Sequence, residues 1–320
     1  MEVAYSICLS VLLGTFAAIA SADTAVESQW WPSEWGADDE RGAANRLTPA
    51  KVLEAVALIR EGKVYELGRN YESTMPLFAD RHFKLTIPGL PTWEPGAGLR
   101  VVYNDEMISG ELGQVGTQFD GLGHVGTESD GEHVFYNGFK LSEFGTSRGL
   151  TKIGVENVGA LFTRGVLIDV VRYKGVARLE PRYEITVDDI ERTLAAQEVE
   201  IREGDAVFIH TGWGQLWNVD NEAYVRTEPG LGLAAIKWLV DKKIVLTAAD
   251  NWGTEVAPPA PPRLLGEGHQ WLMNFNGVYN LENLDLSELA ADQVYEFAFI
   301  FAPLKLVGAT GSPGNPIAVR

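Results

Sequence analysis

The chain has 320 residues, of which 46% are hydrophobic, so it is long enough to bury the core of one large domain or of two small ones. Its 26 basic and 44 acidic residues give a formal net charge of −18, which argues against nucleic acid or an anionic membrane surface as a partner. The charge does not identify the ligand, because acidic surfaces often serve only solubility.

The first residues have the pattern of a secretory signal peptide. An apolar stretch from Val3 to Ala20 is followed by Ser21-Ala22, which gives a small-x-small cleavage pattern. The stretch is near the lower length limit for crossing a bilayer, so an uncleaved membrane anchor is the alternative. We therefore predict a signal peptide at residues 1–22 and a secreted or periplasmic mature domain at residues 23–320, with no membrane partner after cleavage.

Cysteine chemistry is excluded from the mature chain by the same prediction. Cys8 is the only cysteine of the sequence and lies inside the predicted signal peptide. A mature chain without cysteine suits an oxidising compartment and has neither a thiolate nucleophile nor a Cys–zinc site.

Helix and strand patterns alternate along most of the chain. Residues 47–63 predict a helix that is capped by Thr48, begins with Pro49 and closes at Gly62. Further helices are expected at 186–198 and 231–243, and short apolar runs indicate strands at 63–68, 165–173, 205–213, 244–250 and 297–307. The alternation predicts a mixed α/β fold, in which the proline-rich residues 257–263 form a surface loop inside one domain. Trp30, Trp31 and Trp35 are expected to pack on the body of the protein.

The stretch GQVGTQFDGLGHVG, residues 113–126, fits neither a helix nor an alternating strand. Five glycines let the backbone turn tightly and let a ligand approach closely. Polar side chains at short intervals in such a segment suit metal coordination or proton transfer, although a solvated loop can have the same composition. The side chains concerned are Gln114, Gln118, Asp120 and His124.

The same stretch resembles the motif H-x-G-T-H-x-D-x-P-x-H of the metal-dependent cyclase family, which includes bacterial kynurenine formamidases, isatin hydrolases and trans-dienelactone hydrolase-like proteins. Gly116, Thr117, Asp120 and His124 match in identity and spacing, both leading histidines are replaced by glutamine, and Leu122 replaces the proline. The resemblance covers roughly residues 36–310. It includes GADDERGAANRLTP near the start, TAADNWGTE at 247–255 and GHQWLMNFNGVYNLENL at 268–284.

The resemblance implies a cyclase-type (swivelling β/β/α) single domain with a β-sheet core flanked by helices, assembled as a homo-oligomer. It implies a divalent metal at the first two motif positions and the aspartate, which are Gln114, Gln118 and Asp120 here. His124 would be the general base or a second-metal ligand, and His269 and Glu282 would complete the site as metal ligands and catalytic residues. We expect Mn²⁺ or Zn²⁺, with amide oxygens shifting the preference towards harder ions.

The two glutamines leave two alternatives open. Asp120, His124, His269 and Glu282 could hold one ion without either amide, or the site could have lost or weakened its ion. Other histidines are weaker candidates: His82 and His133 are expected on the surface or as satisfied loop residues, whereas His210 lies at a predicted strand end, where site residues often collect.

The residues therefore favour a hydrolase that opens a lactone or cyclic amide, or removes a formyl group from an arylamine, acting on a small-molecule substrate through metal-activated water. The sequence has no G-x-S-x-G elbow, P-loop or Rossmann glycine fingerprint. The alternative is a secreted, non-catalytic relative that uses the glutamine amides to hold a small polar ligand.

Overall fold

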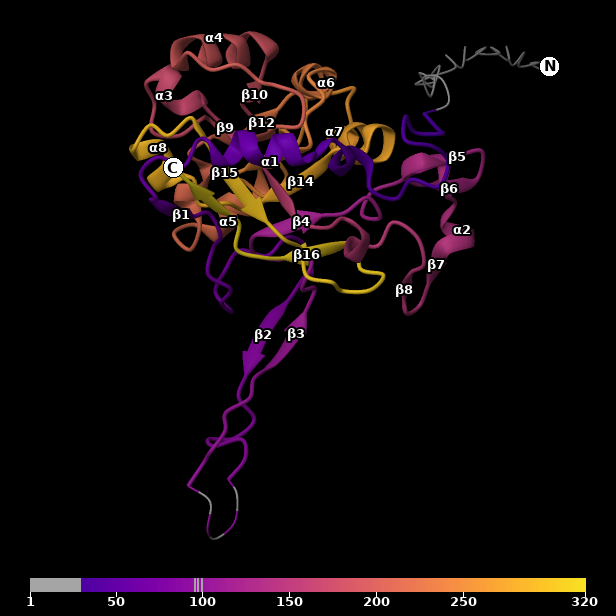
Figure 1. Cartoon of the computed structure of the whole chain (residues 1–320), viewed down its shortest axis with the longest axis vertical. Helices are drawn as coiled ribbons and strands as arrows, with labels where there is room; N and C mark the ends of the chain where they lie inside the picture. Colours follow the sequence, from indigo (N-terminus) through magenta and orange to yellow (C-terminus); the bar gives the residue numbers. More distant parts are fainter. Residues whose placement is uncertain (1–29, 95, 97, 99) are drawn as a thin grey trace, which may run out of the picture.

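A nine-stranded mixed sheet forms the centre of the computed structural model, which describes residues 30–94, 96, 98 and 100–320 (Figure 1). The predicted signal peptide at residues 1–22 and Cys8 lie outside these described residues. In spatial order the strands are β1 (Val64–Glu66), β17 (Ile317–Val319), β15 (Glu296–Phe301), β9 (Leu161–Asp169), β11 (Ala206–His210), β13 (Leu246–Ala249), β14 (Tyr279–Glu282), β4 (Gln118–Asp120) and β16 (Gly311–Pro313).

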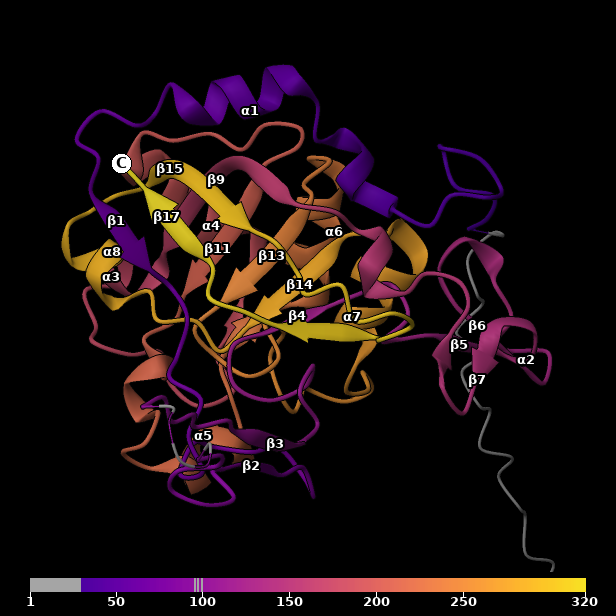
Figure 2. The same cartoon turned by 60° about the horizontal axis from the view of Figure 1, so that its bottom comes forward.

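Parallel strands occupy the middle of this sheet and antiparallel strands lie on both sides. β9, β11, β13 and β14 run parallel, so their carboxyl ends meet at one edge (Figure 2). β15, β17 and β1 continue the sheet antiparallel beyond β9, and β4 and β16 do so beyond β14. Ligand sites of open α/β sheets collect at the carboxyl ends of the parallel strands, so this edge is where a site is expected.

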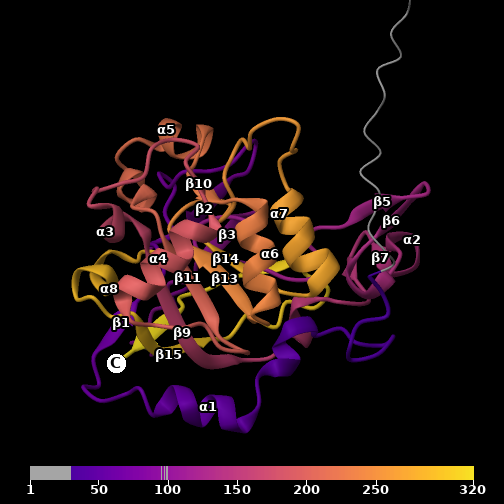
Figure 3. The same ribbon diagram turned by 90° about the horizontal axis from the view of Figure 1, so that it is seen from above.

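Helices cover the sheet and bury its apolar side chains. Figure 3 shows α4 (Val187–Gln197), α6 (Leu233–Asp241) and α7 (Glu267–His269) together on one side of the molecule, and α4 also contacts β9. α1 (Pro49–Val56) packs on β9 and β15. The remaining α-helices are α2 (Leu141–Phe144), α3 (Val170–Lys174), α5 (Asn221–Arg226) and α8 (Ser287–Ala291), and the π-helix η5 (Gln270–Phe275) follows α7 directly.

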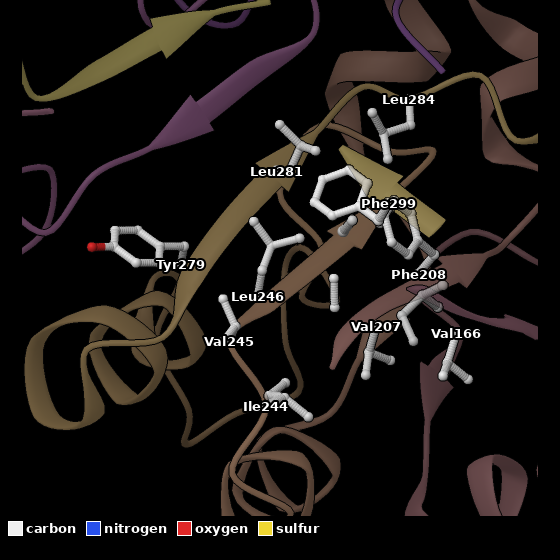
Figure 4. Packing of buried hydrophobic residues seen from close by; sticks show 14 of the residues in the cluster. Val166, Val207, Phe208, Ile244, Val245, Leu246, Tyr279, Leu281, Leu284 and Phe299 are labelled. Carbon is white, nitrogen blue, oxygen red and sulfur yellow. The ribbon is translucent and has the colours of Figure 1, made fainter. Parts of the chain in front are cut away.

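Alternation along β15 separates two apolar layers. Phe297 and Phe299 belong to the main core, where their rings pack edge-on against Phe208 at 5.1 and 5.0 Å between centroids. Figure 4 shows the pair of Phe299 and Phe208. The intervening Ala298 belongs to a second cluster with Ala55 of α1. Successive side chains of a strand point to opposite faces, so one strand supports both layers.

Four small two-stranded sheets complete the fold. The hairpin of β2 and β3 projects away from the rest of the molecule (Figure 1). None of the helices in the described residues is long and apolar enough to cross a membrane. The paired strands are β2 (Phe83–Thr86) with β3 (Met107–Gly110), β5 (Thr127–Ser129) with β6 (Glu132–Val134), β7 (Gly145–Thr146) with β8 (Gly149–Leu150), and β10 (Glu184–Ile185) with β12 (Gly230–Leu231).

The predicted helices and most of the predicted strands are present, with three corrections. The first helix ends at Val56 and not near Gly62. The strand expected at 165–173 ends at Asp169, because the Asp169 side chain accepts from the amide of Arg172 and caps α3. The glycine-rich stretch contains β4, which the sequence did not predict because only three residues form it between glycine-rich turns.

Local packing agrees with two further expectations. The ring of Trp30 packs against Phe275 at 4.6 Å between centroids, and the guanidinium of Arg46 lies 4.6 Å from the centroid of Trp35. Residues 257–263 form a loop without helix or strand, as the prolines predicted.

Candidate metal centre

Two neighbouring antiparallel strands supply the centre of the candidate site. In the register of β4 and β14, Asp120 lies opposite Asn280 and Gln118 lies opposite Glu282. Residues two apart on a strand share a face, and residues directly opposite on paired strands have adjacent Cβ atoms. The strand pairing therefore brings these four polar side chains to one patch of the sheet, although the two strands are more than 150 residues apart in sequence.

His269 reaches this patch from the last position of α7. Its Nε2 atom lies 3.0 Å from Oε1 of Glu282 and 4.0 Å from Oδ2 of Asp120. Asp120, His269 and Glu282 each offer one ligand atom, and all three atoms lie within 4.8 Å of one another. This spacing is suitable for three ligands of a single cation.

The charges of this cluster also fit a divalent cation. Asp120 and Glu282 are buried, at 0% and 2% exposure. Burial raises the pKa of Glu282, and the negative charge of Asp120 raises it further. Two buried carboxylates side by side are costly unless a cation or a proton compensates them, so the donor set fits a metal ion.

Both predicted glutamines contact these carboxylates as hydrogen-bond donors. Nε2 of Gln118 donates to Oε2 of Glu282 at 2.8 Å, and Nε2 of Gln114 donates to Oδ1 of Asp120 at 3.1 Å. An amide nitrogen cannot be a metal ligand, so in this arrangement the glutamines position the carboxylates. Either amide would have to rotate to present its oxygen to an ion.

His124 lies beside the cluster and is not one of its three mutually close ligands. Its Nε2 atom is 3.9 Å from Oδ1 of Asp120, which precedes His124 by four residues. Burial lowers the pKa of His124 and outweighs the opposite effect of the Asp120 charge. A neutral imidazole at this position can accept a proton, which is what a general base requires.

Gly116 is required by the geometry of the loop before β4. Its φ of 63° lies in the left-handed region, and a Cβ atom there would come within 2.8 Å of the Tyr71 ring. A side chain at this position would therefore be strained by its backbone and would clash with Tyr71.

Glu255 is a site residue that sequence reasoning missed. Its Oε1 atom lies 2.5 Å from Nδ1 of His269, and its Oε2 accepts from the amide of Gly268 at 2.9 Å. A carboxylate on Nδ1 fixes the orientation of the imidazole and leaves Nε2 for a metal. Glu255 ends the stretch TAADNWGTE, which carried the family resemblance, but the sequence does not indicate its partner.

The contacts of His269 affect its protonation. Burial lowers the pKa of His269, but the hydrogen bonds to Glu255 and Glu282 prevail and raise it well above its ordinary value. The imidazole is thus held between two carboxylates, and a cation competing for Nε2 must displace a proton.

Asn280 is the second residue that was missed. Its amide nitrogen donates to Oε1 of Glu282 at 2.7 Å, while its Oδ1 accepts from the hydroxyls of Thr247 and Thr254 at 3.0 and 2.8 Å. The two hydroxyls fix which end of the amide faces the cluster. Its alternation with Glu282 on one strand was the available indication.

The other histidines lie elsewhere. His82 and His133 are exposed, as predicted; His82 directly precedes β2, and His133 lies in β6. His210 contacts Asp169, which is not one of the metal-centre residues.

An aromatic stack borders a narrow opening next to the centre. The rings of Phe78 and Trp252 are stacked at 4.6 Å, and both residues line a cavity of about 20 Å³ together with Gln114 and Gln118. That volume suffices for about one water molecule.

The comparisons with known proteins identify the class of protein to which this fold and site belong. The family model described as Putative cyclase matches residues 65–256. A solved structure described as a novel cyclase is 36% identical, with 89% of this chain and 96% of that chain covered and a TM-score of 0.79. The chain belongs to the cyclase family, and the resemblance of the motif is confirmed.

More distant structures share the fold. Isatin hydrolase A from Ralstonia solanacearum is 19% identical over 86% of this chain and 98% of its own, with a TM-score of 0.59. A predicted metal-dependent hydrolase from Bacillus stearothermophilus is 21% identical over 81% of this chain and 98% of its own, with a TM-score of 0.50. The comparison with curated proteins found no match. The fold shared with these solved structures confirms the predicted cyclase-type α/β domain.

Proposed function

We propose that the chain is a metal-dependent hydrolase that opens a lactone or cyclic amide, or cleaves an aryl formamide. The observation that carries the proposal is the convergence of Asp120, His269 and Glu282, with ligand atoms within 4.8 Å of one another. Two structural relatives are described as an isatin hydrolase and as a predicted metal-dependent hydrolase, and these descriptions support the same reaction class.

Asp120, His269 and Glu282 would hold the ion. A divalent cation bound there would polarise a substrate carbonyl and lower the pKa of a water molecule. Two carboxylates and one imidazole suit Mn²⁺ as well as Zn²⁺, because oxygen ligands favour harder ions. Glu255 and Asn280 orient the imidazole and the Glu282 carboxylate for this role.

His124 would move the proton. The oxygen of water forms a bond to the carbonyl carbon while Nε2 of His124 takes a proton from that water. The bond from this carbon to the ring oxygen or the amide nitrogen then breaks, and His124 returns the proton to the departing atom. The products are a carboxylic acid with an alcohol or an amine, and no covalent intermediate with the protein is required.

Replacement of the base tests the proposal. In a panel of lactones, cyclic amides and aryl formamides assayed with Mn²⁺ or Zn²⁺, His124→Ala should lower kcat by roughly 10²- to 10⁴-fold, the usual contribution of a general base. The exposed histidine variant His133→Ala is the matched control and should keep the wild-type rate. Undiminished turnover in the His124 variant would refute the role of His124.

A non-catalytic binding protein is the second candidate, and one observation favours it. The amide nitrogens of Gln114 and Gln118 already satisfy one oxygen each of Asp120 and Glu282. A protein of this kind would hold a small polar ligand and would show neither stoichiometric metal nor hydrolysis that a chelator abolishes. The same substrate panel with and without chelator separates the two candidates.

A further inference from the structure

A second group of charged side chains lies at the carboxyl ends of the parallel strands, apart from the metal-centre residues. Asp169 ends β9, His210 ends β11, and Asp250 follows the last residue of β13. His210 and Asp169 are direct partners in the strand register. All three line a cavity of about 680 Å³, which is within the usual range of small-molecule sites.

The carboxylates of this cavity already have hydrogen-bond donors. Asp169 accepts from Nδ1 of His210 at 2.8 Å and from the amide and Nε of Arg172 at 3.2 and 3.1 Å. Asp250 accepts from the amide and hydroxyl of Thr211 at 2.8 and 2.6 Å and from the amide of Gly214 at 3.3 Å. Their acceptor capacity is therefore largely used within the protein.

The third carboxylate of the cavity is satisfied in the same way. Asp285 accepts from Nη1 of Arg69 at 3.1 Å and from the amide and hydroxyl of Ser287 at 3.1 and 2.5 Å. Arg69 is itself held by the carbonyls of Gly214 and Leu284 at 3.2 and 2.9 Å. This pair therefore forms part of the wall, and most of the acceptor capacity of Asp285 is used within the protein.

Two basic side chains keep unused donors. Nε2 of His210 has no hydrogen-bond partner among the described residues, and Oδ2 of Asp250 is 3.9 Å away. Arg172 donates from Nε to Asp169 and from Nη2 to the carbonyl of Ala290 at 2.8 Å, so its Nη1 has no partner among the described residues. Burial lowers the pKa of His210, but the Asp169 hydrogen bond and the Asp250 charge prevail and raise it, which favours the imidazolium.

Apolar groups form the other walls of the cavity. Trp217, Val171, Leu286 and Ala290 line it alongside the charged residues. With His210 protonated, the three basic and three acidic side chains that line the cavity are balanced in charge. A ligand that accepts two hydrogen bonds and carries one negative charge on an apolar body matches these donors and walls.

We propose that this cavity is a second ligand site that binds a small monocarboxylate with an apolar body, of about the size of benzoate. The carboxylate accepts from Nε2 of His210 and Nη1 of Arg172, and the apolar body lies against Trp217. The proposal does not depend on hydrolysis at the metal centre, because none of the six predicted metal-centre residues lines this cavity.

Isothermal titration calorimetry of the full chain with benzoate tests the proposal. We expect benzoate to bind and benzamide, its uncharged analogue, to bind at least about tenfold more weakly, as expected for loss of a charge-assisted hydrogen bond. His210→Asn keeps a donor for Asp169 and removes Nε2, and Arg172→Met keeps the stem and removes the guanidinium. Each variant should weaken benzoate binding by about tenfold or more.

Two controls locate the binding. Arg192 is a mostly exposed arginine paired with Asp188, so Arg192→Met should bind benzoate as the wild type does. Glu282→Gln alters the metal centre and should also leave benzoate binding unchanged. Circular dichroism checks the fold of each variant, and Arg172→Met carries the test if His210→Asn does not fold. Absence of benzoate binding to the wild type, unchanged binding in the cavity variants, or loss of binding in Glu282→Gln would overturn the proposal.

Discussion

Glu255 determines which nitrogen of His269 faces the carboxylates of the metal centre. The 2.5 Å contact between Oε1 of Glu255 and Nδ1 of His269 leaves Nε2 directed at Glu282 and Asp120. Loss of a carboxylate that orients a ligating histidine in this way typically lowers metal affinity or activity roughly 10- to 100-fold.

Glu255→Gln should therefore weaken metal binding roughly 10- to 100-fold while leaving the fold intact, because the amide has the same shape but lacks the charge. Competition with a metal-sensitive chelating dye measures the affinity. Glu222, which is 84% exposed, provides the control Glu222→Gln, with unchanged affinity. Equal affinities of the wild type and the Glu255 variant would show that Glu255 has no such role.

His210 should make the stability of the fold depend on pH. Burial lowers its pKa, but Asp169 and Asp250 raise it above the ordinary value of 6.5. A group whose pKa is raised on folding makes its full contribution to the stability of the folded state below its unfolded pKa. This contribution is lost as the pH rises through the folded pKa. The free energy of unfolding of the wild type should thus exceed that of His210→Asn by a larger margin at pH 5.5 than at pH 9. Urea denaturation at both values measures this, and an advantage that grows with pH would contradict it.

At the level of single residues, the candidate site could be predicted only in part. The motif identified Asp120 and His124, and the family resemblance identified His269 and Glu282. Asn280 and Glu255 act through hydrogen bonds to residues that the motif does not include. The alternation of Asn280 with Glu282 on one strand was the only local indication of Asn280, and no local pattern indicated Glu255. Whether the glutamines are donors or ligands depends on the rotation of their amides, which sequence does not specify.

Capping residues explain where several elements begin. Thr186 and Asp189 form a capping box at the start of α4, in which each side chain accepts from the backbone amide of the other. Asp169 ends β9 and starts α3 in a similar way. The helix predicted at 186–198 starts at the first of these caps, whereas the second was concealed by a continuous apolar run.

Thr186→Ala should lower the free energy of unfolding by about 1 kcal/mol, because an amide at the first turn of α4 loses its partner. Urea denaturation provides the measurement. Glu191→Ala, an exposed change in the same helix, should alter stability by less than about 0.5 kcal/mol. A cap variant as stable as the wild type would show that this cap contributes nothing.

The arrangement of the whole sheet creates the candidate metal centre. β4 lies between β14 and β16, so a motif near residue 120 meets a strand near residue 280. The alternation of helices and strands predicted the α/β class. It did not predict the strand order, because that order depends on contacts between distant segments and not on the local spacing of apolar residues. Export, removal of residues 1–22 and assembly as a homo-oligomer stay predictions.

The most direct test of the metal centre is the metal content of the purified chain. After incubation with Mn²⁺ or Zn²⁺ and dialysis, elemental analysis should find about one ion per wild-type chain, the number that one three-residue centre can hold. Asp120→Asn should lose that ion, whereas Asp130→Asn, a change in an exposed loop, should retain it. A wild-type chain without metal, or an Asp120 variant that retains the full amount, would contradict the account.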